Sequence, residues 1–179
     1  MIMIYGPAGA GKSTQGRILA EYLGRKWLSA GQIIRDSGKF DDFTSQGKMI
    51  DEEVLVDLIR ENVELVWRGG KEVVFDGQPG SAKQVDYLEK AGLIKKIEAI
   101  VRLEVSEKVL LERLKKRGRA DDNEVVWREK FEYFEQKIYT FLNLLKAKKV
   151  PVLVVNGEGE PEQVAKRILV KIEELVQKS

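Results

Sequence analysis

A glycine-rich segment near the start of the chain constrains the fold more than any other feature. Residues 2–5 are uniformly hydrophobic, and the next eight residues, GPAGAGKS at positions 6–13, fit the pattern G-x-x-x-x-G-K-[ST]. Glycines at these places let successive backbone N–H groups surround a phosphate at the start of a helix. The pattern after a predicted strand therefore indicates a phosphate-binding loop; the alternative is a glycine-rich turn that contains a lysine by chance.

Three polar residues are candidates for the chemistry at this loop. Lys12 is placed to reach a transferred phosphoryl group, and the hydroxyl of Ser13 is placed to bind Mg²⁺. Asp76 follows a hydrophobic run at residues 73–75, at the carboxyl end of a predicted strand, where open α/β sheets bind their ligands. Its carboxylate could hold Mg²⁺ directly or through water; the alternative is that Asp76 and Gly77 only form a turn.

The composition excludes several other chemistries. The 179 residues include neither cysteine nor histidine, which excludes disulfides, thiol and imidazole catalysis, and zinc sites built from those ligands. Lys and Arg total 31 against 29 Asp and Glu, and this net charge of +2 disfavours a nucleic-acid-binding surface. No apolar stretch approaches the ~18 residues of a membrane span, and no secretion signal is evident. We therefore expect a cytoplasmic protein without nucleic-acid or membrane partners.

Hydrophobic runs alternate with longer amphipathic segments, which predicts parallel strands joined by helices. The predicted strands are Ile2–Tyr5, Trp27–Ser29, Val73–Phe75, Ile97–Val105 and Val152–Val155. The predicted helices are Lys12–Leu23, Glu52–Trp67, Ala82–Lys90, Glu107–Lys116, Asn123–Lys146 and Pro161–Val176. The sequence thus predicts an α/β, three-layer P-loop NTPase fold with a central five-stranded parallel sheet, in one domain of residues 1–179.

Two regions add detail to this fold. Residues 30–67 predict a helix, a polar turn and a second helix with no strand between, which indicates a small helical lobe inserted after the second strand. The long helix from Asn123 carries large apolar residues at intervals of 4, 3, 4, 3 and 4, and this stripe predicts a core-facing side. A coiled-coil dimer is less well supported because the pattern spans too few heptads.

Four separated segments resemble the adenylate kinase and nucleoside monophosphate kinase family, in a short-lid or lidless form. The loop continues as S-T-Q at 13–15, similar to the family's G-K-G-T-Q. The segment LSAGQIIR at 28–35 resembles S-T-G-D-x-x-R, and FDGQPG at 75–80, with Gln84, resembles D-G-[FY]-P-R-x-x-x-Q. Arg113, Arg117 and the segment RADD at 119–122 resemble R-x-x-x-R followed by G-R-x-D-D. Their order and spacing hold along the chain.

This resemblance implies Mg²⁺-dependent, reversible phosphoryl transfer from ATP to a nucleoside monophosphate, with AMP as the first acceptor to test. It implies a catalytic set, Lys12, Arg117 and Arg119, and Mg²⁺ ligands, Ser13 and Asp76. It implies an ATP-binding set of Gly9, Ala10, Gly11, Lys12, Ser13, Thr14, Arg113 and Arg117. It also implies a set that binds the monophosphate: Ala30, Arg35, Lys48, Ile50, Gly77, Gly80, Gln84, Arg119 and Lys130. Residues 30–67 would be the acceptor lobe, and 117–121 a minimal lid loop.

The arginines also suit phosphate on chemical grounds. Guanidinium groups bind phosphate oxygens in pairs, and Gly118 between Arg117 and Arg119 lets the chain direct both toward one centre. Asp121 and Asp122 could orient them through charge-assisted hydrogen bonds, or cap the next helix. The alternative for the basic cluster at 115–119 is favourable charge at a helix C-terminus.

Most departures from the family pattern fall on the acceptor side. Four residues differ there, Ala30 for threonine, Gln32 for aspartate, Gln78 for an aromatic residue and Gly80 for arginine, whereas the donor loop is intact. Lys130 stands where an arginine is common, and lysine keeps the charge but loses the paired hydrogen bonds. The family's long lid insertion is absent because a single glycine separates the two arginines.

These departures leave two alternatives to a nucleoside monophosphate kinase. One is a kinase of another small-molecule acceptor, since shikimate- and gluconate-type kinases share the loop and a helical acceptor lobe, although the spacing of Arg35 and Gln84 favours a nucleotide. The other is a nucleotide-binding protein with little catalysis. We expect ATP and a nucleoside monophosphate as partners, Mg²⁺ and no zinc, and a monomer or small homo-oligomer.

Overall fold

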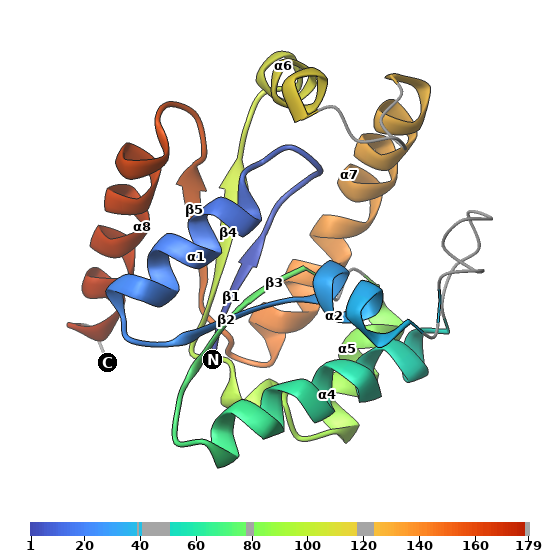
Figure 1. Ribbon diagram of the computed structural model, residues 1–179, viewed down its shortest axis with the longest axis vertical. Helices are drawn as coiled ribbons and strands as arrows, with labels where there is room; N and C mark the ends of the chain where they lie inside the picture. Colours follow the sequence, from blue (N-terminus) through green and yellow to red (C-terminus); the bar gives the residue numbers. More distant parts are fainter. Residues whose placement is uncertain (39, 41–50, 78–80, 118–123, 178–179) are drawn as a thin grey trace.

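The computed structural model describes residues 1–38, 40, 51–77, 81–117 and 124–177. Five parallel strands form one sheet in the order β2-β3-β1-β4-β5 (Figure 1). The strands are β1 (Ile2–Tyr5), β2 (Lys26–Ser29), β3 (Val73–Asp76), β4 (Ala99–Glu104) and β5 (Val152–Asn156). The helices are α1 (Lys12–Tyr22), α2 (Ala30–Ser37), α4 (Glu52–Arg68), α5 (Ala82–Lys90), α6 (Glu107–Arg117), α7 (Glu124–Ala147) and α8 (Pro161–Val176).

The strand register brings three chain segments to one edge of the sheet. Asp76 at the end of β3 pairs with Ile4 of β1 on one side and with Ser29, the last residue of β2, on the other. Because these strands are parallel, their carboxyl ends lie together, next to the loop that joins β1 to α1. This edge is where the candidate site residues gather.

Two hydrophobic clusters cover the two faces of the sheet. On one face, Ile2 and Ile4 of β1 pack with residues of α1 and α8, and these two helices contact each other (Figure 1). On the other face, Met3 of β1 and Phe75 of β3 pack with residues of α4, α5 and α7. Strands β1 and β3 are buried along their whole length, which accounts for their lack of polar alternation. The predicted three-layer arrangement is confirmed.

The predicted elements agree closely with the observed ones. The start and end of the helix Pro161–Val176 and of the helix Ala82–Lys90 were predicted without error. The predicted core-facing stripe of α7 is confirmed, because its described members are buried or half-buried: Trp127, Phe131, Phe134, Ile138, Phe141 and Leu145.

One strand prediction, Ile97–Val105, was too long. A single 3-10 turn, Ile94–Lys96, precedes β4, and Ile97 still donates its N–H to the carbonyl oxygen of Ile94. Ile97 thus belongs to the end of this turn, and the strand begins at Ala99. Hydrophobic character alone does not separate a buried turn residue such as Ile97, which is 7% exposed, from a strand residue.

Helices α2 and α4 lie between β2 and β3 in the chain and pack against each other. The N-terminus of α4 is capped by Asp51, whose Oδ1 accepts the N–H of Glu53 at 2.9 Å. The predicted polar turn of the lobe at 38–47 lies mostly outside the described residues, and the division of the chain into lobe and lid stays a prediction. None of the helices among the described residues is both long and apolar enough to span a membrane.

An ion cluster lies at the amino ends of the strands, opposite the edge where the candidate site residues gather. The N-terminal ammonium group of Met1 donates to Glu98 Oε1 at 2.6 Å, and Arg25 makes two hydrogen bonds of 2.8 Å to the same carboxylate. Partial burial raises the pKa of Glu98, but the hydrogen bonds from Arg25 and the ammonium group outweigh it, so the pKa lies below its ordinary value of 4.5. The native state therefore favours the ionised carboxylate.

The Glu98→Gln variant should lower the free energy of unfolding at pH 7 by about 0.5–1 kcal/mol, because the ion pairs are half-exposed. The native pKa is lowered, so this stabilisation is present above the unfolded-state pKa and is lost as pH falls through the native pKa. Urea unfolding between pH 7 and pH 3.5 measures the difference, which should shrink below about pH 4.5. Glu173→Gln, at an exposed position, is the control. Equal free energies of unfolding for Glu98→Gln and the parent chain at every pH would contradict the prediction.

Candidate active site

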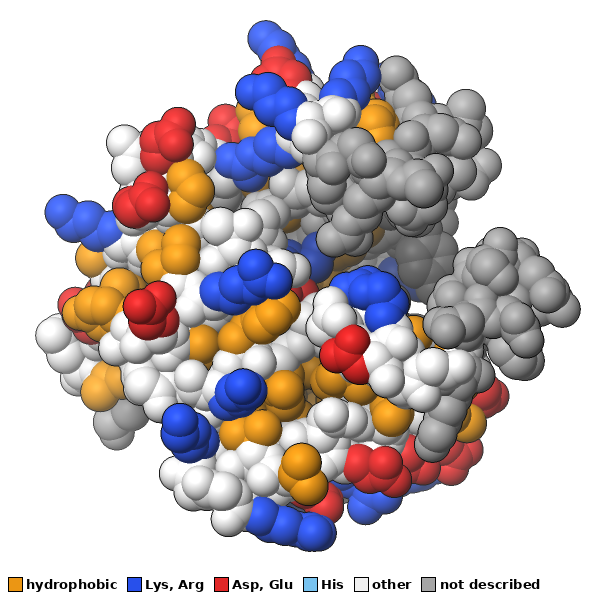
Figure 2. Space-filling view, viewed as in Figure 1, with side chains coloured by type: hydrophobic (Ala, Val, Ile, Leu, Met, Phe, Trp, Pro, Cys, Tyr) orange, Lys and Arg blue, Asp and Glu red, His pale blue; other side chains and the backbone are white. Residues whose placement is uncertain are grey.

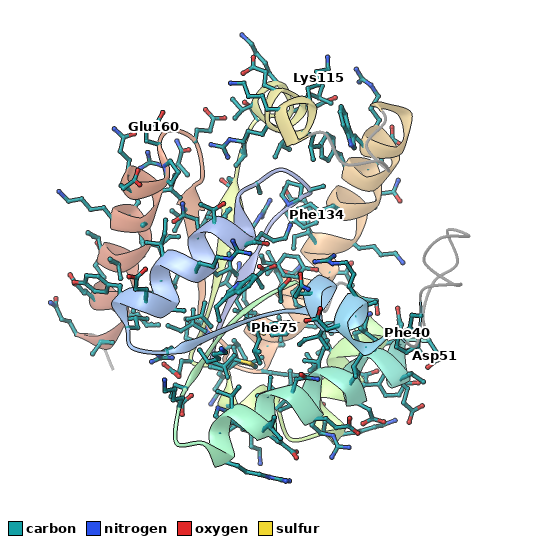
Figure 3. All side chains as sticks on the ribbon, in the orientation of Figure 1. Phe40, Asp51, Phe75, Lys115, Phe134 and Glu160 are labelled. Carbon is teal, nitrogen blue, oxygen red and sulfur yellow. The ribbon has the colours of Figure 1, made fainter. Side chains whose placement is uncertain are left out.

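A cavity of about 700 Å³ lies at the carboxyl edge of the sheet. Its walls come from the glycine-rich loop, the ends of β2 and β3, helices α2 and α6, and the turn between β5 and α8. Lys115 on α6 and Glu160 before α8 stand at the same end of the molecule (Figure 3). Lys and Arg side chains gather over α6 (Figure 2). Among the predicted site residues, those on its walls are Gly9, Ala10, Gly11, Lys12, Ser13, Thr14, Arg35, Asp76, Gly77 and Arg113.

The backbone of the loop explains why glycine is needed there. Gly9 and Gly11 have φ angles of 82° and 92°, in the left-handed region that other residues rarely adopt. A Cβ on Gly9 would also lie 3.1 Å from the carbonyl oxygen of Leu110 and 3.1 Å from Cγ of Leu114, both on α6. Gly11 precedes α1 without a side-chain cap, so the N–H groups of the first turn can face an anion.

The ammonium group of Lys12 lies back over the loop. Its Nζ donates to the carbonyl oxygens of Gly6 and Pro7, each at 2.8 Å. These bonds hold the positive charge beside the backbone N–H groups that would surround a phosphate. The arrangement can attract and orient a polyphosphate, as the sequence pattern predicts.

Arg113 links the loop to the turn that precedes α8. Its Nη1 would lie 3.9 Å from a Cβ on Gly11, and its Nη2 donates to the carbonyl oxygen of Gly159 at 3.3 Å. On the other side of the turn, the buried side chain of Gln15 donates from Nε2 to the carbonyl oxygen of Pro161 at 2.9 Å. The turn before α8 is thus held against the loop side of the cavity by contacts from α1 and α6.

The turn itself was missed by the sequence analysis. Gly157, Gly159, Glu160 and Pro161 line the cavity, although none was a candidate residue. The signal was present, because two glycines and a helix-starting proline directly follow a strand at the ligand-binding edge. Gly159 has a φ of 97°, and a Cβ there would lie 2.7 Å from Gln163 Oε1.

Arg35 is the cationic residue that α2 contributes to the cavity. Its Nη2 donates to Gln32 Oε1 at 2.8 Å, and Gln32 in turn donates from Nε2 to Asp36 Oδ1 at 2.6 Å. Gln32, which departs from the family pattern, thus holds Arg35 through its amide oxygen. Arg35 and Arg113 reach the cavity from helices that follow β2 and β4, strands that lie on opposite sides of β1 in the sheet.

Three other predicted acceptor residues occupy different places. Gly77 lines the cavity with a φ of 125°, and a Cβ there would lie 2.7 Å from the Cβ of Ala30. Ala30 and Gln84 are only 3% and 4% exposed, and neither is among the described residues that line the cavity. Ala30 therefore packs beneath Gly77, and Gln84 lies buried in the first turn of α5.

The hydroxyl of Ser13 and the carboxylate of Asp76 face the same cavity, and this donor set suits a hard cation. Asp76 is 3% exposed; its Oδ2 accepts from Trp27 Nε1 at 3.1 Å, and its Oδ1 lies 3.5 Å from Ser29 Oγ. Within the described part of the chain, no three acidic side chains gather into a metal cluster. One carboxylate and one hydroxyl fit Mg²⁺, which completes its coordination with water and phosphate oxygens.

Several predicted residues lie outside what the structure describes. These are Lys48, Ile50, Gly80 and Arg119, together with most of the predicted lid loop 117–121. Arg117 is the last residue of α6 and Lys130 lies in α7, but their side chains are outside the description. Their assigned roles stay predictions.

The strand order β2-β3-β1-β4-β5 and the glycine-rich loop between β1 and α1 define the class of P-loop nucleotide-binding proteins. A family model described as adenylate kinase matches residues 4–150. The chain belongs to the adenylate kinase family, and the resemblance found in its sequence is confirmed. The predicted enzyme class, a phosphotransferase, is confirmed with it.

Curated relatives cover nearly the whole chain. An adenylate kinase of Thermus thermophilus is 31% identical over an alignment of 181 positions, which covers 93% of this chain and 94% of that protein. One from a Synechococcus species is 30% identical over 177 residues, 93% of this chain and 95% of its own length. One from Bifidobacterium longum is 30% identical over an alignment of 191 positions, which covers 96% of this chain and 99% of that protein.

The Gly9→Ala variant should weaken ATP binding about tenfold or more, because the methyl group must strain the loop and press on α6. Calorimetric titration with ATP measures the affinity. Gly24→Ala is the matched control, because Gly24 has a φ of 63° but a Cβ there would meet nothing within 4 Å. It should share the backbone strain and leave ATP affinity unchanged; equal affinities for both variants would contradict the prediction.

Proposed function

We propose that this protein catalyses reversible, Mg²⁺-dependent transfer of the γ-phosphoryl group of ATP to a nucleoside monophosphate, with AMP as the preferred acceptor. The observation that carries the proposal is that Lys12 of the phosphate loop and Arg35 of α2 line one cavity. A donor phosphate held at the loop and an acceptor phosphate held at Arg35 would therefore share a single cavity.

The chemistry follows from charge and alignment. Phosphoryl transfer passes through a loose transition state whose charge lies on the phosphate oxygens, so positioning and neutralisation of charge supply most of the catalysis. The backbone N–H groups of residues 9–14 and the ammonium group of Lys12 would hold the ATP phosphates. No side chain has to remove a proton from the acceptor phosphate, which agrees with a chain that has no histidine.

Ser13 and Asp76 would hold Mg²⁺ beside the loop. The ion would supply positive charge against the phosphate oxygens. Arg117 and Arg119 would close over the phosphates from the end of α6, since Arg113 of the same helix already reaches the donor side of the cavity. A guanidinium group suits this role because it binds two phosphate oxygens at once.

The acceptor is proposed from the relatives and from Arg35. The three relatives named above are adenylate kinases, which supports AMP. Arg35 is the described cation on α2 that an acceptor phosphate could reach, and Gln32 holds it in place. Gly77 lines the cavity and packs on the buried Ala30, so its backbone would form part of the floor on which the acceptor lies.

A coupled assay of ADP formation across AMP, GMP, CMP, UMP and the deoxynucleoside monophosphates tests the acceptor. We expect the highest kcat/KM with AMP, and no turnover without added Mg²⁺. Shikimate and gluconate belong in the same panel because they represent other acceptors of P-loop kinases. Turnover with one of these, or silence with every acceptor, would contradict the proposal.

The Lys12→Ala and Arg119→Ala variants should each lower kcat about 10²-fold or more, because each removes a charge that stabilises the transferring phosphoryl group. Initial rates at saturating ATP and AMP measure the loss. Lys71→Ala, an exposed lysine in the turn before β3, is the control and should keep the parent rate. A near-normal rate in either test variant would remove that residue from the catalytic set.

A further inference from the structure

A tryptophan binds the carboxylate that faces the cavity. Trp27 lies on β2 opposite Val74 of β3, two residues before the pair formed by Ser29 and Asp76. Side chains two residues apart on a strand share a face, so the indole of Trp27 and the carboxylate of Asp76 lie diagonally on the α1 side of the sheet. The indole Nε1 donates to Asp76 Oδ2 at 3.1 Å.

Helix α1 holds the indole against the sheet. The guanidinium carbon of Arg17 lies 4.5 Å from the centre of the Trp27 ring, which is a cation–π contact. The ring is half-buried and packs against the hydrophobic cluster under α1 and α8. Its position is therefore fixed from above by α1 and from below by the strands.

Gly16 makes room for this ring. A Cβ on Gly16 would lie 2.6 Å from both Cδ1 and Nε1 of Trp27, and 3.7 Å from the Cβ of Asp76. Glycine in a helix interior is less stable than alanine, so its presence four residues after Lys12 needs a reason. The contact supplies the reason, because any larger residue would displace the atom that donates to Asp76.

We propose that Trp27 is a positioning residue that orients the Asp76 carboxylate toward Mg²⁺, and that Gly16 is the residue that admits the indole. This inference rests on the proposed function, which assigns Mg²⁺ to Asp76. An indole has one N–H donor and no acceptor, so it commits Oδ2 of the carboxylate. Among the described residues, Oδ1 has only a long contact of 3.5 Å from Ser29 Oγ, and its remaining lone pair would serve the cation or its water. A neutral donor also orients the carboxylate without placing a cation in direct competition with Mg²⁺.

The test compares the apparent Kd of Mg²⁺ for the ATP-bound protein, obtained by calorimetric titration of ATP at a series of Mg²⁺ concentrations. Trp27→Phe keeps an aromatic ring and removes the donor, and it should raise this Kd about tenfold, the scale for loss of a partner of a metal ligand. The Kd of ATP measured in EDTA should stay unchanged. Trp27→Gln restores a donor of similar reach and should recover much of the lost affinity.

The chain offers a matched control. Trp67 Nε1 donates to Glu72 Oε2 at 3.3 Å, away from the cavity. Trp67→Phe removes the same atoms and should leave the affinity for Mg²⁺ at the parent value. Thermal unfolding of each variant separates a loss of stability, which a purely structural tryptophan would cause, from a loss of metal affinity.

Gly16→Ala tests the geometry without altering the tryptophan. It should raise the apparent Kd of Mg²⁺ as Trp27→Phe does, because the methyl group displaces the indole. Added to Trp27→Gln, it should cause no further loss. An unchanged Kd in both Trp27→Phe and Gly16→Ala would overturn the proposal.

Asp76→Asn separates this inference from the proposed function. If Asp76→Asn weakens Mg²⁺ binding while Trp27→Phe does not, the positioning role alone is overturned. If Asp76→Asn leaves the Mg²⁺ affinity unchanged, the metal assignment fails and the positioning role fails with it. The supporting result is a weakened affinity in both variants, with no additional effect of Trp27→Phe in the Asp76→Asn background.

Discussion

The close approach of the glycine-rich loop to α6 is the contact on which the rest of the cavity depends. Gly9 lies so near the backbone of Leu110 and the side chain of Leu114 that a Cβ there would lie 3.1 Å from each, closer than ordinary van der Waals contact. This contact places the glycine-rich loop against the middle of α6. It accompanies the approach of Arg113, whose Nη1 would lie 3.9 Å from a Cβ on Gly11.

The parallel register of β1, β2 and β3 builds the opposite wall of the cavity. It aligns Ser29 and Asp76 at one edge, and α2 begins directly after Ser29. Arg35 follows within two turns of that helix, held by Gln32. The two walls of the cavity are thus consequences of backbone geometry, one from a glycine contact and the other from strand pairing.

Much of the fold could be predicted from the sequence because its strongest signals are local. The apolar strands β1 and β3 and the apolar stripe of α7 depend on neighbouring residues in the chain, and so does the loop pattern at 6–13. The start of β4 was misplaced because Ile97, which follows the 3-10 turn, is as hydrophobic and as buried as a strand residue.

The site was predictable only where a motif marked it. Gly157, Gly159, Glu160 and Pro161 line the cavity because β5 ends at the same edge as β1, and this proximity joins parts of the chain about 150 residues apart. The bond between Trp27 and Asp76 joins residues 49 positions apart. Such contacts follow from strand register and helix packing, which the sequence pattern does not specify.

In the first two turns of α1, neighbouring residues make contacts with several different parts of the site. Lys12 and Ser13 face the phosphate side, Gln15 bonds the turn before α8, Gly16 admits the indole and Arg17 covers it. Consecutive residues of a helix point about 100° apart and residues four apart share a face, so these contacts are separated either by direction around the axis or by one turn along it. Insertion or deletion of a single residue in this stretch would rotate every later side chain by about 100° around the helix axis and direct it to the wrong neighbour. We expect this segment to tolerate substitutions far better than changes of length.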